Sequence, residues 1–344
     1  MTVLRLAETQ FQKFMRIKSS MKRILTAFIS VLLLSGIAVQ ASDLIIESKN
    51  QTFNEADNKI KFNGNVKVSV DDLKVVGETA DVDITKDQKL DTATFYEKPY
   101  AFEIKKNKKR EVKANILKVS LITKIIRAEG DTQSIVFEGK KPVVVINADV
   151  QEYDTKTGVM TATGAVTMLY KEIETFSNSA QITTDKNGDL KKLVLTGNAR
   201  VKQEKNESYA DKFVYEAASG NLTAYGNTTS NSTMDDGSKL TLKSNYQEYN
   251  QKRSTFNASG NVRIWYQDYY AAGPKVTLYP SQGSAKPNEA YFTGRSSITQ
   301  GVRTIYADKI KMTMKPKSFN AEGNTRTVIR NIGSGSDDNV TLGL

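Results

Sequence analysis

The stretch Ile60-Lys-Phe-Asn-Gly64-Asn-Val-Lys-Val68 sets a pattern that recurs along most of this chain. Seven glycines have apolar residues at the second and fourth positions before them, and Asn follows five of these glycines. The glycines are Gly64, Gly164, Gly197, Gly226, Gly260, Gly294 and Gly323. The apolar positions often continue with period two after the glycine, which is typical of a β-strand. The pattern therefore predicts strands with the glycine on the same face as the apolar residues.

A second marker, Ala followed by Asp or a relative, alternates with the glycine marker. Its copies are Ala80-Asp81, Ala114-Asn115, Ala148-Asp149, Ala180-Gln181, Ala210-Asp211 and Ala307-Asp308. Successive markers of one kind lie roughly 28 to 35 residues apart, which is enough for two strands and their turns. Polar segments such as the one holding Asn187-Gly188, a strong hairpin signal, lie between the two kinds of strand.

These repeats predict an all-β fold, a long antiparallel folded sheet of about sixteen strands with the shape of a β-jellyroll or taco-like solenoid. A flat sheet that wide would curl or split, so we expect the glycines to form a fold line along which the sheet creases into a trough. At about 4.8 Å per strand the trough would be roughly 75 Å long. Its two open edges invite head-to-tail self-association. The irregular corner at Lys98-Pro99 is expected to differ, with Gly130 resuming the pattern.

Composition excludes several classes of function. The 344 residues contain no Cys and no His, so disulfides, thiolate or imidazole metal sites and His-based triads are excluded. The net charge of +11 is spread along the chain, which gives no indication of nucleic-acid binding. No phosphate-binding glycine loop or isolated pair of carboxylates stands out. We therefore expect no enzyme activity, no metal and no cofactor.

The N-terminus has the pattern of an export signal. Met21-Lys22-Arg23 is a basic segment, residues 24–34 are apolar, and cleavage is expected after Ala41. Residues 1–41 are thus assigned as a signal peptide, with Met21 as an alternative start, and the mature chain is expected in the periplasm. An uncleaved membrane anchor is the competing interpretation, although the apolar run is short for a membrane span.

The alternation of Ala-Asp with apolar-x-apolar-x-Gly-Asn-Val, behind a signal peptide, resembles the LptA/OstA family of lipopolysaccharide transport proteins. The resemblance implies a β-jellyroll over residues 42–330, as one long module or two fused modules, followed by a flexible tail at residues 331–344. It also implies a function: shielding the acyl chains of lipopolysaccharide or a related envelope lipid during transport to the outer membrane. The implied partners are the inner- and outer-membrane components of the transport bridge.

The candidate lipid groove consists of the apolar residues at even offsets from the marker glycines. They are Ile60, Phe62, Val66, Val68, Met160, Ala162, Val166, Met168, Leu193, Leu195, Leu222, Phe256, Val262, Ile264, Phe292, Ile298 and Phe319. Each of them could equally pack in the core of a closed sandwich. In an incompletely closed folded sheet the two roles overlap, because the groove is part of the core.

Other functions stay open at this point. The chain could be an inner-membrane-anchored bridge component of the same pathway. It could be a structural β-solenoid surface protein or adhesin, although the hairpin-marked double repeat argues against a parallel β-helix. A polysaccharide-acting enzyme would need a clustered acid pair, which we do not find. Bound lipid separates a carrier from the other classes.

Overall fold

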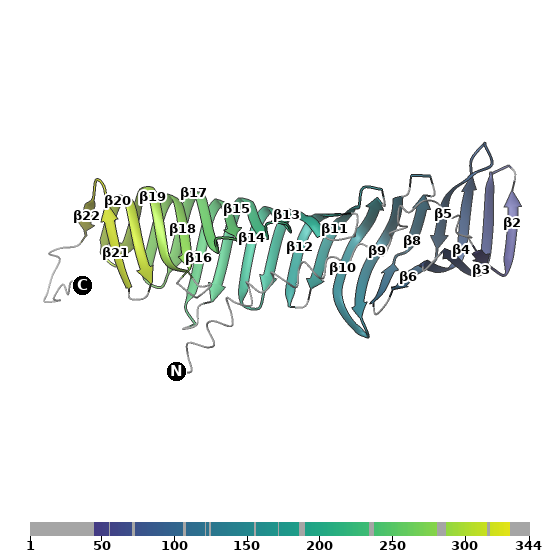
Figure 1. Ribbon diagram of the computed structural model, residues 1–344, viewed down its shortest axis with the longest axis horizontal. Helices are drawn as coiled ribbons and strands as arrows, with labels where there is room; N and C mark the ends of the chain where they lie inside the picture. The colour runs from purple at the N-terminus through teal and green to yellow at the C-terminus, as the bar shows by residue number, and fades with distance from the viewer. Residues whose placement is uncertain are drawn as a thin grey trace.

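The computed structural model describes residues 45–330 apart from short gaps, and it shows one antiparallel sheet (Figure 1). The gaps are residues 55, 71–72, 106–107, 121, 124, 155, 171, 186–189, 234–236, 281–286 and 315–316. The predicted signal peptide, the tail at 331–344 and most of the turn around Asn187-Gly188 lie outside the described residues. The described residues contain twenty-two strands, which confirms the predicted all-β folded sheet.

Most rungs of the sheet are single long strands. These are β3 (Lys59–Val70), β4 (Leu73–Ile84), β9 (Ile125–Glu138), β10 (Lys141–Asp154), β11 (Val159–Tyr170), β12 (Ile173–Thr184), β13 (Leu190–Gln203), β14 (Asn206–Glu216), β15 (Asn221–Thr233), β16 (Lys239–Asn250), β17 (Thr255–Tyr266), β18 (Tyr269–Pro280), β19 (Pro287–Gln300) and β20 (Arg303–Met314). Four rungs are split into two short strands each. They are β1 (Ile45–Glu47) with β2 (Asn50–Asn54), β5 (Leu90–Tyr96) with β6 (Tyr100–Lys105), β7 (Lys108–Lys113) with β8 (Ile116–Ser120), and β21 (Lys317–Glu322) with β22 (Arg326–Ile329).

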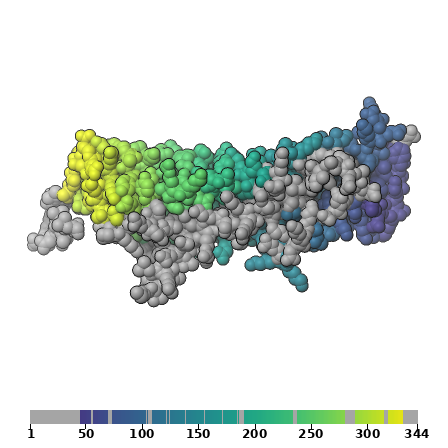
Figure 2. Space-filling view, viewed as in Figure 1, coloured from purple at the N-terminus to yellow at the C-terminus, as the bar shows by residue number. Residues whose placement is uncertain are grey.

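Each rung pairs antiparallel with the next one along the chain, so the described part of the molecule is a long meander. The strands lie side by side across the long axis in Figure 1, and Figure 2 shows the chain running in order from one end to the other. Eighteen described rungs at about 4.8 Å give roughly 80 Å. The rungs from β3 to β20 match the predicted sixteen in number. The two extra rungs are the short split ones at the ends, which are too short to carry the repeat pattern.

A β-bulge bends the strand at every marker glycine except Gly323, which lies in the interruption between β21 and β22. In β11, Thr163 pairs with Ser179 and Val166 pairs with Ser177, so Gly164 and Ala165 together lie opposite one residue of β12. Both residues of the bulge have left-handed φ angles, +82° at Gly164 and +44° at Ala165. Glycine and asparagine tolerate this conformation best, which explains why Asn so often follows the glycine. The successive bulges crease the sheet into two walls.

The glycines do not share the face of the apolar residues, so that part of the prediction is wrong. A Cβ atom on Gly164 would lie 1.9 Å from Oδ2 of Asp149, whose side chain is exposed on the outside of the crease. A Cβ atom on Gly226 would likewise lie 2.1 Å from Oδ2 of Asp211. Ala162 and Val166 keep even spacing through the bulge, whereas Gly164 between them has a left-handed φ angle, which changes the direction in which its Cβ atom would point. Asp149, Asp211 and Asp308 of the Ala-Asp markers are therefore corner residues, each of which covers the glycine of the following rung.

The split rungs show a different corner. Between β5 and β6 the strand is interrupted at Glu97 and Lys98, which have φ angles of +63° and +60° and precede Pro99. Proline cannot donate a ladder hydrogen bond, so the two walls are separate strands here. The regular corner returns at Gly130 in β9, where a Cβ atom would meet Asn115. The altered corner predicted from Lys98-Pro99 is thus observed.

The core lies between the two walls and falls into three clusters of buried apolar residues. The first runs from Phe62 to Ala128, the second from Val136 to Ala224, and the third from Leu242 to Ile310. Each cluster combines residues that precede the bulges with residues that follow them, such as Ala162 and Val166 in β11. The apolar interior therefore extends along the length of the described sheet.

Candidate functional site

The candidate site is the interior of the folded sheet, and the structure places most of the predicted groove residues there. Those with buried side chains are Phe62, Val66, Met160, Ala162, Val166, Met168, Leu195, Val262, Phe292 and Ile298. Those that are partly buried against the same clusters are Ile60, Val68, Leu193, Leu222, Phe256 and Ile264. The partly buried residues lie at the margins of the three core clusters.

Phe319 is the exception among the predicted residues, with a side chain that is 40% exposed. It lies in β21, where it pairs with Met312 of β20, a residue packed against the third core cluster. The guanidinium carbon of Arg303 lies 5.5 Å from the centre of its ring. Phe319 is exposed because β21 and β22 form the last described rung, and no further described strand covers it.

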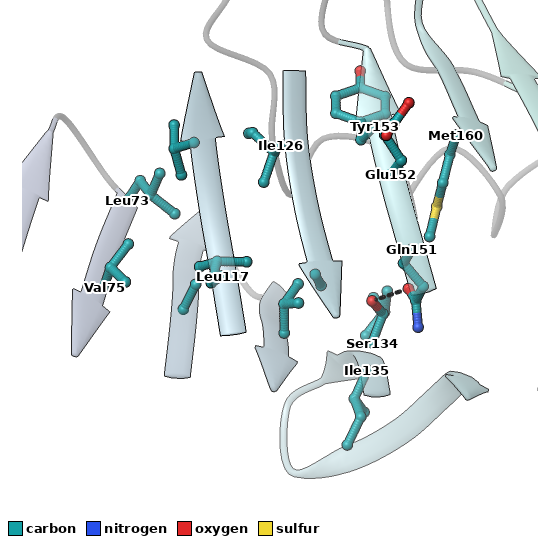
Figure 3. A pocket seen from close by; sticks show the side chains of 15 residues that line it. Leu73, Val75, Leu117, Ile126, Ser134, Ile135, Gln151, Glu152, Tyr153 and Met160 are labelled. Atoms are coloured by element: carbon teal, nitrogen blue, oxygen red, sulfur yellow. Dashed lines mark hydrogen bonds between the residues drawn. The ribbon is translucent and has the colours of Figure 1, made fainter. Parts of the chain in front are cut away.

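One cavity, the first cavity, lies between β4 and β11, and its empty volume of about 670 Å³ includes space that is open to solvent (Figure 3). Leu73, Val75, Leu117, Ile126 and Met160 supply much of its apolar lining. Four polar residues also line it, namely Ser134, Gln151, Glu152 and Tyr153. An apolar cavity with few polar groups is the usual form of a small-molecule site.

The second cavity lies within the third core cluster and has an empty volume of about 630 Å³, also partly open to solvent. Its lining includes Leu242, Ile264, Leu278, Phe292 and Met312. These residues come from β16 to β20, so the cavity spans several rungs. Both cavities are therefore lined mainly by apolar side chains from several successive rungs.

Two buried glutamines join the walls just inside the crease. Gln151 accepts a hydrogen bond from Ser134 Oγ at 2.6 Å, and its Nε2 donates to Thr132 Oγ1 at 2.9 Å and to the carbonyl of Ile146 at 3.3 Å. We call this set of hydrogen bonds around Gln151 the first glutamine clip. Burying a side-chain amide costs free energy unless its donor and acceptor atoms are hydrogen-bonded, as they are here.

The second glutamine clip surrounds Gln247. Ser230 Oγ donates to its Oε1 at 2.6 Å, and its Nε2 donates to the carbonyl of Leu242 at 3.4 Å. Thr228 Oγ1, in turn, donates to the carbonyl of Ser244 at 2.8 Å. The boundaries between the three core clusters fall at the two clips, so the apolar interior is divided into three segments.

Tyr153, another residue of the first cavity, has a buried side chain that ends in a hydroxyl group. Its side chain is 3% exposed, and its Oη has no hydrogen-bond partner in the part of the chain that the structure describes. Burial raises the pKa of Tyr153 to about 12, so the phenol stays protonated at neutral pH. Tyr153 therefore lines the first cavity and carries a protonated hydroxyl that has no partner among the described residues.

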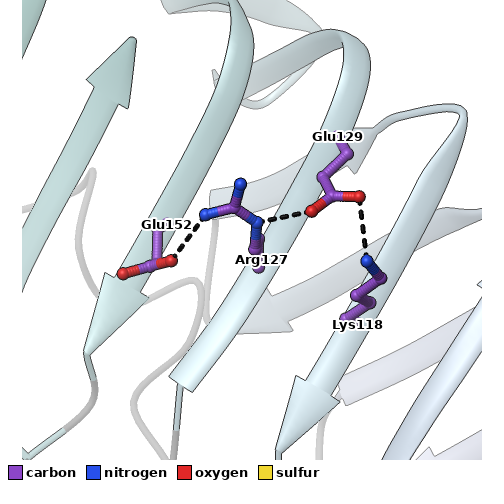
Figure 4. Close-up of polar contacts among 4 residues, drawn as sticks. All are labelled: Lys118, Arg127, Glu129 and Glu152. Atoms are coloured by element: carbon purple, nitrogen blue, oxygen red, sulfur yellow. Dashed lines mark hydrogen bonds and ion pairs between the residues drawn. The ribbon is translucent and has the colours of Figure 1, made fainter.

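The outer face of the same strands is charged. Arg127 Nε lies 2.5 Å from one oxygen of Glu129, Lys118 Nζ lies 3.0 Å from the other, and Arg127 Nη1 lies 2.9 Å from Glu152 (Figure 4). The hydrogen bond from Arg127, followed by that from Lys118, lowers the pKa of Glu129. These side chains alternate along β9 with the inward Ile126 and Ala128. Exposed ion pairs of this kind contribute little to stability. Their main effect is to make the outer face of the sheet hydrophilic, in contrast to its apolar inner face.

The candidate groove predicted from the sequence includes only strands that carry glycine, so it omits the interior residues of the other strands. The other strands contribute equally, through the third and fifth residues after the Ala of the second marker. Those positions hold Leu117 and Val119, Gln151 and Tyr153, Phe213 and Tyr215, and Ile310 and Met312. This spacing was readable from the sequence. The burial of Gln151 was not, since an isolated Gln in a strand normally indicates a solvent-facing position.

Among the described residues, no helix is long and apolar enough to cross a membrane. The same residues contain no group of three or more Asp and Glu side chains arranged to hold a metal ion.

Comparison with known proteins decides the family. The model of the family described as "LptA/(LptD N-terminal domain) LPS transport protein" matches residues 45–141 and 145–284, well over half of the chain. The chain belongs to this family of lipopolysaccharide transport proteins. The match confirms the resemblance inferred from the repeats. No protein with a curated description matches the chain.

Among solved structures, the chain is similar to that of LptH from Pseudomonas aeruginosa, described as the LptA homologous periplasmic component of the lipopolysaccharide transport device. The two share 11% sequence identity, and the alignment covers 95% of LptH but 38% of this chain, with a TM-score of 0.33.

Proposed function

We propose that this member of the lipopolysaccharide transport family is a periplasmic carrier that holds acyl chains inside its folded sheet. The observation that carries the proposal is the apolar interior, which runs between two walls along the described length and contains two cavities. Charged side chains such as Arg127 and Glu129 make the outer face of the sheet hydrophilic. The interior needs no catalytic group, because shielding requires only an apolar lining.

Burial energetics support this role. Exposing an acyl chain of about twelve carbons to water costs roughly 10 kcal/mol, at about 0.8 kcal/mol per CH₂ group. A lipid with several chains therefore needs a continuous shield to cross an aqueous compartment. Partly buried residues such as Leu193, Leu222 and Ile264 offer weak, repeated contacts along the way. Weak contacts suit transport, because a tight site would stop the lipid.

The ends of the sheet suit assembly into a bridge. The first described rung exposes Ile45 and Phe53, and the last exposes Phe319 and Ile329. Among the described residues, no further strand pairs with either edge rung, so backbone groups at both edges can pair with another chain. We therefore propose that the ends contact membrane-bound components of the transport bridge or another copy of the chain, head to tail.

Export is part of the proposal, and it rests on residues outside the described structure. We expect the periplasmic form to begin after Ala41 if the segment at 24–34 is a cleaved signal. N-terminal sequencing of the protein recovered from the periplasm tests this directly. Recovery of the intact N-terminus in the membrane fraction would instead favour the anchored bridge component.

Site-specific photo-crosslinking in cells tests the carrier role. Ile264 and Trp265 are adjacent residues of β17 that lie on opposite faces. Ile264 lines the second cavity, whereas Trp265 is 37% exposed and lies beneath the ammonium of Lys243 at 5.8 Å. A photo-reactive side chain at Ile264 is expected to form adducts with lipopolysaccharide, and the same probe at Trp265 is not.

The matched pair makes the outcome clear. Lipid adducts at Ile264 alone support the carrier, and mass analysis of the adduct identifies the lipid. Equal labelling at both positions would indicate nonspecific contact with membrane. Absence of lipid at Ile264 in the folded, exported protein would contradict the proposal and favour a structural surface protein.

A further inference from the structure

The chain contains a structural duplication with an offset of 96 residues. Gly130 and Gly226, Thr132 and Thr228, Ser134 and Ser230, Gln151 and Gln247, Tyr153 and Tyr249, and Gly164 and Gly260 occupy equivalent places. In both copies the glutamine accepts from the serine on the preceding rung at 2.6 Å. Both copies also place a tyrosine two residues after the glutamine. The two copies can therefore serve as controls for each other.

The copies differ at the tyrosine. The hydroxyl of Tyr249 is hydrogen-bonded to the side chain of Ser254. The residue equivalent to Ser254 in the first copy is Gly158, so Tyr153 lacks this partner. Both positions have left-handed φ angles, +69° at Gly158 and +52° at Ser254, so the backbones of the two turns are alike. The missing hydrogen bond follows from one side chain and not from a different fold.

The surroundings of Tyr153 point to a ligand that would replace the missing partner. The ring lines the first cavity together with Met160 and Ile126 (Figure 3). An unpaired buried hydroxyl costs free energy, and an acceptor brought in by a ligand would remove that cost. The neighbouring Gln151 already has three hydrogen bonds, so it does not compete for the acceptor. An acyl chain fits the apolar lining, and its ester or amide carbonyl is an acceptor without charge.

We propose that Tyr153 is a binding residue that donates a hydrogen bond to the ester or amide carbonyl of an acyl lipid in the first cavity. The inference rests on the proposed carrier function and adds a polar recognition point to it. It predicts that the first copy distinguishes an acyl lipid from a chain that has no carbonyl. The second copy does not, because Tyr249 is already bonded within the protein.

Two lipids that differ only in the carbonyl provide the test. The probes are a lysophosphocholine with a 1-dodecanoyl ester chain and its 1-dodecyl ether analogue. Full-length mature protein is expected to bind the ester about five-fold more tightly, which is the size of effect of one neutral hydrogen bond. Infrared spectroscopy of a ¹³C-labelled ester is expected to show the bound carbonyl band at lower frequency than in Tyr153→Phe.

Three variants separate recognition from folding. Tyr153→Phe removes the donor and is expected to bind ester and ether equally. Gly158→Ser supplies the partner that Tyr249 has in the second copy, so the preference should also fall although the tyrosine remains. Tyr249→Phe is the matched control and should keep the preference. If Tyr153→Phe folds poorly, Gly158→Ser decides the result.

Each outcome has one meaning. A preference for the ester that disappears in Tyr153→Phe and Gly158→Ser supports the inference. Equal binding of both lipids by the wild type, or a preference that survives in both variants, overturns the inference and leaves the carrier function intact. Failure of the wild type to bind either lipid overturns the carrier function and the inference together.

Discussion

The corner of β11 and the corner between β5 and β6 fold the same sheet in two ways. At the first, Gly164 and Ala165 form a bulge and the strand continues from one wall to the other. At the second, Glu97 and Lys98 take left-handed φ angles and the strand is interrupted. The comparison teaches that a glycine bulge inside the sheet creases a strand without breaking it, whereas bulky residues in the same conformation accompany a break. At the last described rung, which has a neighbour on one side only, the strand is interrupted even at Gly323 and Asn324.

The largest expected effect is at the continuous corner. Gly164→Ala is expected to destabilise the protein by about 3 kcal/mol, because it adds left-handed strain and places a Cβ atom 2.6 Å from Cβ of Asp149. Urea unfolding measures the change. The control is Gly139→Ala at a turn with φ of +62° and no atom within 4 Å, where strain alone should cost about 1 kcal/mol. Equal losses would show that packing on Asp149 is unimportant.

The next largest effect is expected at the first glutamine clip, which joins the two walls beside the crease. Gln151→Leu is expected to cost about 2 kcal/mol, since it removes the first glutamine clip and leaves the hydroxyls of Thr132 and Ser134 with fewer partners. Thermal or urea unfolding measures it. The control Gln181→Leu, on the exposed face of β12, should change stability by less than about 0.5 kcal/mol. A neutral Gln151→Leu would mean that the walls need no polar clip.

The interrupted corner gives an effect of opposite sign. Lys98→Gly is expected to stabilise the protein by about 1 kcal/mol, because glycine takes the φ angle of +60° without strain. Lys98→Ala keeps the strain and is the control for loss of the lysine side chain. The unfolding midpoint in urea measures both. A destabilised Lys98→Gly would show that the lysine side chain makes a contribution larger than the strain.

The smallest effect concerns the second residue of the bulge. Ala165 has a φ angle of +44° where other corners have Asn, as at Asn198 with +47°. Ala165→Asn is therefore expected to raise stability by about 0.5 kcal/mol, since Asn tolerates this conformation better than Ala. Asn198→Ala is the reverse change and should lower stability by a similar amount. Changes of the same sign in the two variants would refute the explanation for Asn in the repeat.

Much of the fold was predictable from the sequence, because its signals are local. The period-two pattern around Phe256 and Val262 gave the strands, and the recurrent Gly-Asn gave the creases. Two features were not predictable because they depend on neighbouring rungs. The packing of Asp149 on Gly164 requires knowing the register between strands, and so does the outward direction of the glycine. The short edge strands carry too few residues to show a repeat.

The candidate site was predictable in its apolar part and not in its polar part. Residues such as Val66 and Phe292 follow the repeat and are buried. Gln151 and Tyr153 follow the second marker at positions that hold apolar residues in other rungs. Their burial depends on partners such as Ser134, seventeen residues away. Only the structure brings these groups to one cavity.

The most direct test of an acyl-binding interior uses the single tryptophan of the chain. Trp265 lies on the outer face, so its fluorescence in the wild type should be insensitive to a lipid whose acyl chain carries bromine, a contact quencher. The double variant Ile264→Trp and Trp265→Phe places the tryptophan at the second cavity instead. We expect the brominated lipid to quench the double variant and not the wild type. No quenching in the folded double variant, or equal quenching in both proteins, would contradict an interior that holds acyl chains.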